Sequence, residues 1–116
     1  MVINGVSQSS GVERVVEITR AESEIAFVFR DRIGNVERES ILFPMDDILA
    51  TLADRPKGGS TINGTSPNRE ERKLLDIEVK RNEVLLTARG ESKPGSDAAV
   101  GLDDLMDALE GVMPSD

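Results

Sequence analysis

The chain has 116 residues, of which 22 are acidic and 14 basic, so its net charge is −8. It contains no cysteine and no histidine, which excludes disulfides and zinc–thiolate sites and removes the commonest general base and metal ligand. The negative charge argues against broad attraction to nucleic acid or anionic lipid, although it is compatible with a local basic stripe.

Apolar residues indicate one small, largely aliphatic core, because the only aromatic residues are three phenylalanines. A core of this size gives limited stability, so we expect a homodimer that buries further apolar surface. No apolar run approaches the roughly 20 residues that span a bilayer, and residues 1–11 lack the features of a signal peptide. We therefore expect a cytoplasmic protein without a membrane partner, folded as a single domain over residues 1–116, with residues 1–11 as a loose polar tail.

Two-residue alternation predicts the first strands. Residues 12–20 and 24–31 each place apolar side chains on one face, and residues 21–23 join them as a short hairpin. A Gly-Asn turn at 34–35 leads to a third strand over 36–43, which is charged first and apolar at its end, as in an edge strand. The inward residues of the first two strands are Val12, Val16, Ile18, Ile25, Phe27 and Phe29.

The stretch FPMDDILATL (43–52) predicts a helix, because its apolar side chains recur at helical spacing. Pro44 suits the first position, and two aspartates in the first turn favour the positive end of the helix dipole. Residues 56–70 follow; they are rich in Gly, Ser and Asn and predict a flexible linker. The helical stripe consists of Met45, Ile48, Leu49 and Leu52.

After the linker the same plan restarts. LLDIEV (74–79) corresponds to VVEITR (15–20) and EVLLTAR (83–89) to EIAFVFR (24–30), both at an offset of 59, while VGLDDLMDAL (100–109) corresponds to the helix at an offset of 57. We therefore expect an α+β protein of two βββα repeats, in which each antiparallel sheet is followed by a helix and the whole forms a pseudo-twofold unit. The repeats cover about 12–55 and 71–113. Residues 96–100 are a poor third strand, after a mobile loop at 90–97.

This plan resembles the purine-rich-element-binding (PUR) repeat and is similar to Whirly-type single-stranded nucleic-acid-binding folds. The residues that carry the likeness are LLDIEVKRNEVLLTARGE and VGLDDLMDALEGV, with their first-half partners, ILFP (41–44) and KRNE (80–83). The resemblance implies single-stranded nucleic-acid binding and dimerisation through the helices. This chain departs from the family in lacking Tyr and Trp and in being acidic.

Arginines at the hairpins are the candidate binding residues. Arg30, Arg32 and Arg38 flank the turn at 33–35, and Arg81 and Arg89 lie in the matching second hairpin. They could bind phosphates while Phe27 or Phe29 stacks on a base. Alternatively, the two phenylalanines are buried and the arginines pair across strands with nearby glutamates. The candidate glutamates are Glu37, Glu39, Glu83 and Glu91.

Catalytic and metal sites are not expected. The chain has no His, Cys or Tyr and none of the common catalytic motifs, so we predict that it is not an enzyme and has no catalytic residue and no cofactor. Asp103, Asp107 and Glu110 share a helical face but lack a wrapping loop, so we expect helix-dipole compensation and a solvated face rather than a metal site.

The function expected from these observations is a non-catalytic binding module, with single-stranded nucleic acid as its ligand. The alternative is a protein–protein adaptor or assembly subunit with a basic protein partner. The methionines Met45, Met106 and Met113 could form a partner groove or pack the helices on the sheet.

Overall fold

The computed structural model describes residues 1–54, 59–91 and 95–113. Its elements are β1 (Val2–Val6), β2 (Glu13–Ala21), β3 (Glu24–Asp31), β4 (Glu37–Pro44), α1 (Met45–Asp54), β5 (Ser60–Thr65), β6 (Arg72–Lys80), β7 (Glu83–Gly90), β8 (Ser96–Gly101) and α2 (Leu102–Val112). Each half of the chain thus supplies four strands followed by a helix. The internal duplication itself stays a prediction.

All eight strands form one closed antiparallel barrel in chain order, with β8 pairing back onto β1. The expected fold of two βββα repeats with separate sheets is therefore wrong. Each half has four strands rather than three, and its outer strands pair with those of the other half, at β4–β5 and β8–β1. This pairing removes the edges that two open sheets would expose. The strand expected at an edge, over 36–43, lies within the barrel as β4.

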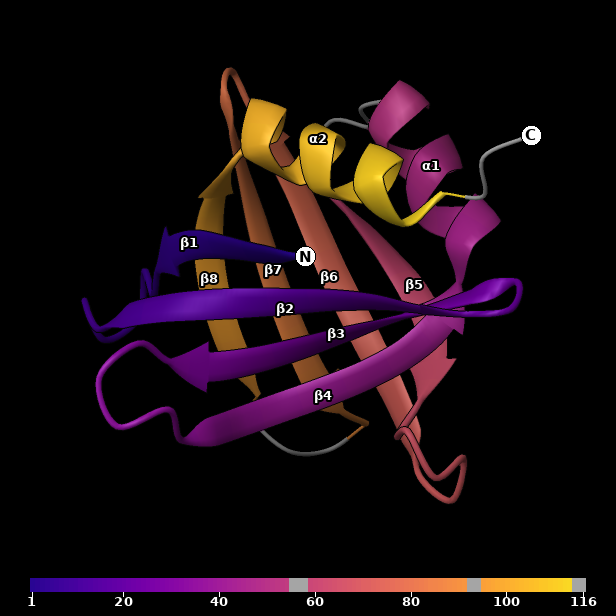
Figure 1. Cartoon of the computed structure of the whole chain (residues 1–116), viewed down its shortest axis with the longest axis horizontal. Coiled ribbons are helices and arrows are strands. Elements are labelled where there is room, and N and C mark those ends of the chain that lie inside the picture. Colours follow the sequence, from indigo (N-terminus) through magenta and orange to yellow (C-terminus); the bar gives the residue numbers. More distant parts are fainter. Residues whose placement is uncertain (55–58, 92–94, 114–116) are drawn as a thin grey trace.

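Both helices lie over the same side of the barrel, above the crossing strands of the two halves (Figure 1). Each helix begins against a hairpin of its own half, because the Met45 N–H donates to Ser23 O at 3.1 Å and the Leu102 N–H to Asn82 O at 2.7 Å. The inward helix residues complete the core. They are Met45, Ile48 and Leu52 in α1, and Leu102, Leu105, Ala108 and Leu109 in α2.

Two strands were missed because their sequences are polar and glycine-containing. β1 lies in the expected tail and β5 in the expected linker. Gly5 and Gly64 sit where the halves meet, and a Cβ atom there would lie 2.6 Å from Ala99 O and 2.5 Å from Leu42 O. Glycine is therefore required by close backbone approach rather than by a turn. A signal was present, since Ile-Asn-Gly-x-Ser occurs at residues 3–7 and 62–66, again 59 residues apart.

The alternating strands were predicted correctly. β2 and β3 bury Val16, Ile18 and the phenylalanines inside the barrel, whereas Val12 precedes β2 and is exposed. The poor strand at 96–100 forms as β8, where pairing with β7 overrides its weak propensity. Within the expected mobile loop at 90–97, residues 92–94 lie outside the described residues, while 96 and 97 belong to β8. Neither helix in the described part is long and apolar enough to cross a bilayer.

Candidate functional site

Four of the five candidate arginines are ion-paired. Three surround the β3–β4 hairpin and the fourth lies on β7, so the structure does not gather them into one groove. The pairs are Arg30–Glu37 at 3.6 Å, Arg32–Glu13 at 3.6 Å, Arg38–Asp31 at 2.5 Å and Arg89–Asp76 at 2.6 Å. Arg81 occupies the β6–β7 turn with a φ of 47° and makes no ion pair with a described residue. This arrangement matches the surface-pairing alternative better than phosphate binding.

The two candidate stacking residues point into the barrel. Phe27 and Phe29 are fully buried, and the Phe27 ring meets Phe43 edge-on with centroids 5.0 Å apart. A nucleic-acid base could reach either ring only if the barrel opened. Both phenylalanines are therefore core residues.

A partly buried polar cluster at the β8–β1 junction was not predicted from the sequence. Asp97 on β8 accepts hydrogen bonds from the Ser7 and Ser9 hydroxyls and from the Gln8 and Ser9 N–H groups, at 2.7–3.2 Å. Arg14 on β2 donates to Asp97 O at 2.8 Å and contacts Asp31 at 3.3 Å. We call the set Ser7, Ser9, Arg14, Asp31 and Asp97 the Asp97 clasp. The available signal was Arg14 itself, a charged residue in phase with the inward-facing Val16 and Ile18.

The carboxylates of the Asp97 clasp are held in their ionised form. The hydrogen bond from Arg38 is the largest cause of the lowered pKa of Asp31; burial opposes it and Arg14 reinforces it. For Asp97, burial is the largest influence and acts to raise the pKa, but the hydrogen bonds from Ser9, Ser7 and the backbone together outweigh it and lower the pKa. The clasp thus has the chemistry of a satisfied structural network rather than of an acid–base site.

The β4–β5 junction is built differently. Its ladder consists of one residue pair, Leu42 with Thr65, and Lys73 of β6 reaches across to Glu39 of β4 at 2.5 Å. Both of these charged side chains are mostly buried. A hollow of about 330 Å³ lies beside them, lined by Glu37, Ser40, Ser66, Pro67, Asn68, Glu71 and Lys73.

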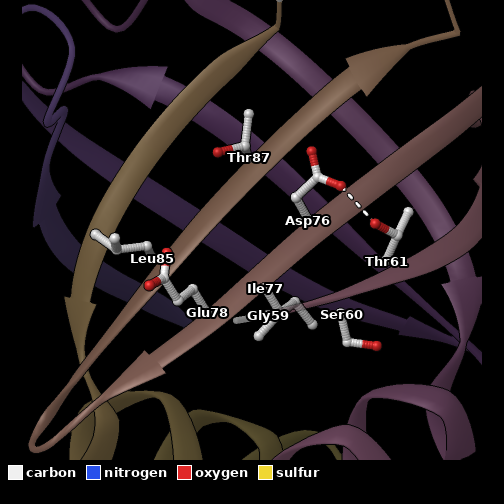
Figure 2. Close-up of a pocket in the computed structure, with 8 residues that line it drawn as sticks. All are labelled: Gly59, Ser60, Thr61, Asp76, Ile77, Glu78, Leu85 and Thr87. Atoms are coloured by element: carbon white, nitrogen blue, oxygen red, sulfur yellow. Dashed lines mark hydrogen bonds between the residues drawn. The ribbon is translucent and has the colours of Figure 1, made fainter. Parts of the chain in front are cut away.

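A second hollow, of about 290 Å³, lies on the outer face of β5, β6 and β7 (Figure 2). Asp76 accepts a hydrogen bond from the Thr61 hydroxyl at 2.7 Å and from Arg89 Nε at 2.6 Å. Arg89 is the largest cause of the lowered pKa of Asp76; burial opposes it and Thr61 adds to it. Thr87, Glu78 and Leu85 complete the outward wall. Its carboxylate acceptor, Asp76, already accepts hydrogen bonds from Thr61 and Arg89.

The outer surface of the helices is the most distinctive electrostatic feature. Seven exposed carboxylates lie on α1 and α2, and neither helix contains a lysine or arginine. The other 15 acidic residues of the chain nearly balance its 14 basic residues, so almost the whole net charge of −8 belongs to the helices. We call this surface the helix face. Its carboxylates are Asp46, Asp47, Asp54, Asp103, Asp104, Asp107 and Glu110.

Among the described residues, no group of three or more Asp or Glu side chains is arranged to hold a metal ion. Comparisons of the chain with protein-family models, curated proteins and solved structures find no match.

Proposed function

We propose that this chain is a non-catalytic protein-binding module whose partner presents a basic surface to the helix face. The proposal rests on the concentration of negative charge on the helix face. A surface with seven carboxylates and no cation on its own helices attracts cationic partners and repels anionic ones. Outside the two helices the charges nearly cancel, with 15 acidic and 14 basic residues.

Exposed methionines also lie on the helix face. Met106 and Met113 of the α2 region are 41% and 42% exposed and lie among the α2 carboxylates, whereas Met45 is buried in the core. The Met1 side chain lies beside Gly111 on the same helix. Methionine adapts its shape to varied apolar surfaces. The helix face therefore fits a partner that combines basic and apolar side chains.

Single-stranded nucleic-acid binding, which the resemblance to PUR repeats implies, has less support. Four of the five candidate arginines already engage carboxylates, and the helix face would repel phosphates. The expectation of dimerisation through the helices meets the same difficulty, because two such faces carry the same sign of charge. The absence of enzymatic activity stays a prediction from the missing His, Cys and Tyr.

The test compares two triple variants of equal charge change. The probe is a synthetic amphipathic helix with lysines on one face and leucines on the other, titrated calorimetrically at low and physiological salt. We expect Asp103→Asn/Asp107→Asn/Glu110→Gln to weaken binding about tenfold or more, since close opposite charges then lose their partners. The control, Glu70→Gln/Glu71→Gln/Glu91→Gln, removes three exposed carboxylates from the part of the barrel away from the helices and should change affinity much less.

Equal losses in the two variants would show that only net charge matters and would contradict the proposal. A single-stranded oligonucleotide is titrated in parallel. If it binds, with affinity that falls steeply as salt rises, nucleic-acid binding replaces the proposed function.

A further inference from the structure

A second exposed apolar surface lies at the end of the barrel where the β1–β2 and β3–β4 loops meet, side by side in Figure 1. It contains Ile33, the most exposed large apolar residue of the described chain at 84%, together with Val6, Val12 and Val36 at 42%, 42% and 48%. We call these four residues the loop patch. The other exposed large apolar residues are Met1, Val2, Met106 and Met113.

Backbone contacts hold the members of the loop patch together. The Arg32 N–H donates to Glu13 O at 3.0 Å, which places the β3–β4 loop against the start of β2. The Ser7 N–H donates to Val12 O at 2.9 Å, which holds the end of β1, where Val6 lies, next to Val12. Val12 and Ile33 line one hollow of about 280 Å³. The Asp31 N–H donates to Val36 O at 2.9 Å and closes the loop that carries Ile33 and Val36. Hydrogen-bonded backbone thus brings the four residues of the loop patch to one end of the barrel.

The charges around the loop patch are balanced. Arg30, Arg32 and Arg38 each pair with a carboxylate, so the border of the patch carries both signs. A twofold contact brings a surface against its own copy, which requires that the surface be complementary to itself. An apolar centre with a border of both signs meets this requirement, because ion pairs can form across the axis. The helix face does not meet it.

We propose that a second copy of this chain covers the loop patch, so that the protein is a twofold dimer that leaves both helix faces free. The proposal does not rest on the function proposed for the helix face. Standard stable interfaces involve about 20–30 residues on each side. The loop patch is smaller, so the dimer is expected to dissociate reversibly on dilution.

Sedimentation equilibrium of the full chain over a range of concentrations tests the proposal. The wild-type protein should show a monomer–dimer equilibrium, and Ile33→Asp should raise the dimer dissociation constant about 100-fold, since a central apolar contact is replaced by facing like charges. Met106→Asp places the same substitution on the helix face and should leave the dimer unchanged. Circular dichroism confirms that both variants, which alter exposed side chains, are folded.

Any of three results would overturn the proposal. The first is a wild-type protein that stays monomeric throughout the concentration range. The second is a dimer that Met106→Asp dissociates, and the third is a dimer that Ile33→Asp leaves intact.

Discussion

The two junctions between the halves of the barrel are closed by different means. At β8–β1, two ladder pairs are reinforced by the Asp97 clasp, in which a loop donates four hydrogen bonds to one carboxylate. At β4–β5, one ladder pair is reinforced by the ion pair between Lys73 and Glu39. Corresponding parts of the fold can therefore be joined by a hydrogen-bonded loop or by a single ion pair.

The cations at the two junctions occupy corresponding positions, 59 residues apart. Arg14 serves Asp31 and the Asp97 carbonyl at once, because its guanidinium presents several donors in a rigid fork. Lys73 concentrates its charge on one ammonium group and contacts mainly Glu39, with Glu71 further away at 3.8 Å. We therefore expect the stability of the β8–β1 junction to depend on a network of side chains and that of the β4–β5 junction on one ion pair.

The largest loss of stability is expected at the two glycines, one at each junction. Gly64→Ala and Gly5→Ala should each lower the free energy of unfolding by about 3 kcal/mol, because the added methyl overlaps a carbonyl oxygen of the neighbouring strand. Urea unfolding measures the loss. Gly111→Ala is the control, since its methyl would meet only the flexible Met1 side chain and alanine favours the helix. Unchanged stability in both barrel variants would show that the junctions open without consequence.

Removing the Asp97 carboxylate should have the next largest effect on the free energy of unfolding. Asp97→Ala leaves two hydroxyls and two N–H groups without their acceptor, and we expect a loss of about 2 kcal/mol in the free energy of unfolding. Ser40→Ala changes the corresponding residue of β4 and should alter stability by less than about 0.5 kcal/mol. Equal effects in the two variants would remove the distinction between the junctions.

A double-mutant cycle sharpens the contrast at the β4–β5 junction. Lys73→Met alone should destabilise the protein by about 1 kcal/mol or more, since Glu39 is then mostly buried without its partner. Adding Glu39→Leu should restore much of the loss, because an apolar pair replaces the ion pair. Strictly additive losses in urea unfolding would mean that the two side chains do not interact.

Acid should weaken the protein through the lowered pKa values of Asp31, Asp76 and Asp97. An unfolded aspartate titrates near about 3.9, so below that pH the unfolded chain binds protons before the folded one does. The stability contributed by these groups is present above about pH 4 and is lost as pH falls through the lowered folded values. Urea unfolding between pH 2 and 7 should show this loss in the wild type and a smaller one in Asp97→Asn.

The parts of the fold that could be predicted were those with dense local patterns. β2, β3, β6 and β7 alternate large apolar residues, and the helices repeat a stripe, so their bounds and faces follow from the sequence. β1 and β5 each bury a single large apolar residue, Ile3 and Ile62, which is too little for a periodic signal. Closure depends on pairing between strands distant in sequence, which no local pattern encodes.

The same limit applies to the candidate site. The clustering of Arg30, Arg32 and Arg38 at one hairpin was predictable from the turn between them. Glu37 was correctly named as a partner and pairs with Arg30. Glu13 and Asp31 were missed, because Glu13 reaches Arg32 through the register of β2 on β3 and Asp31 reaches Arg38 through the register of β3 on β4. The inward-facing Arg14 and Lys73 could have been noticed, since each interrupts an apolar face. The acidity of the helices was visible, but its concentration on one surface required knowing that both helices lie on the same side.

The barrel is closed by two junctions between halves that each contain four strands and a helix. This construction makes the chain suited to fragment complementation. A cut between Asp54 and Ser60 would leave two pieces of four strands and a helix, joined by only three backbone ladder pairs. Reassembly of the fragments would then depend mainly on their shared interior and on the side-chain links described above. Fused to the halves of a reporter, the pieces would convert the strength of each junction into a measurable signal.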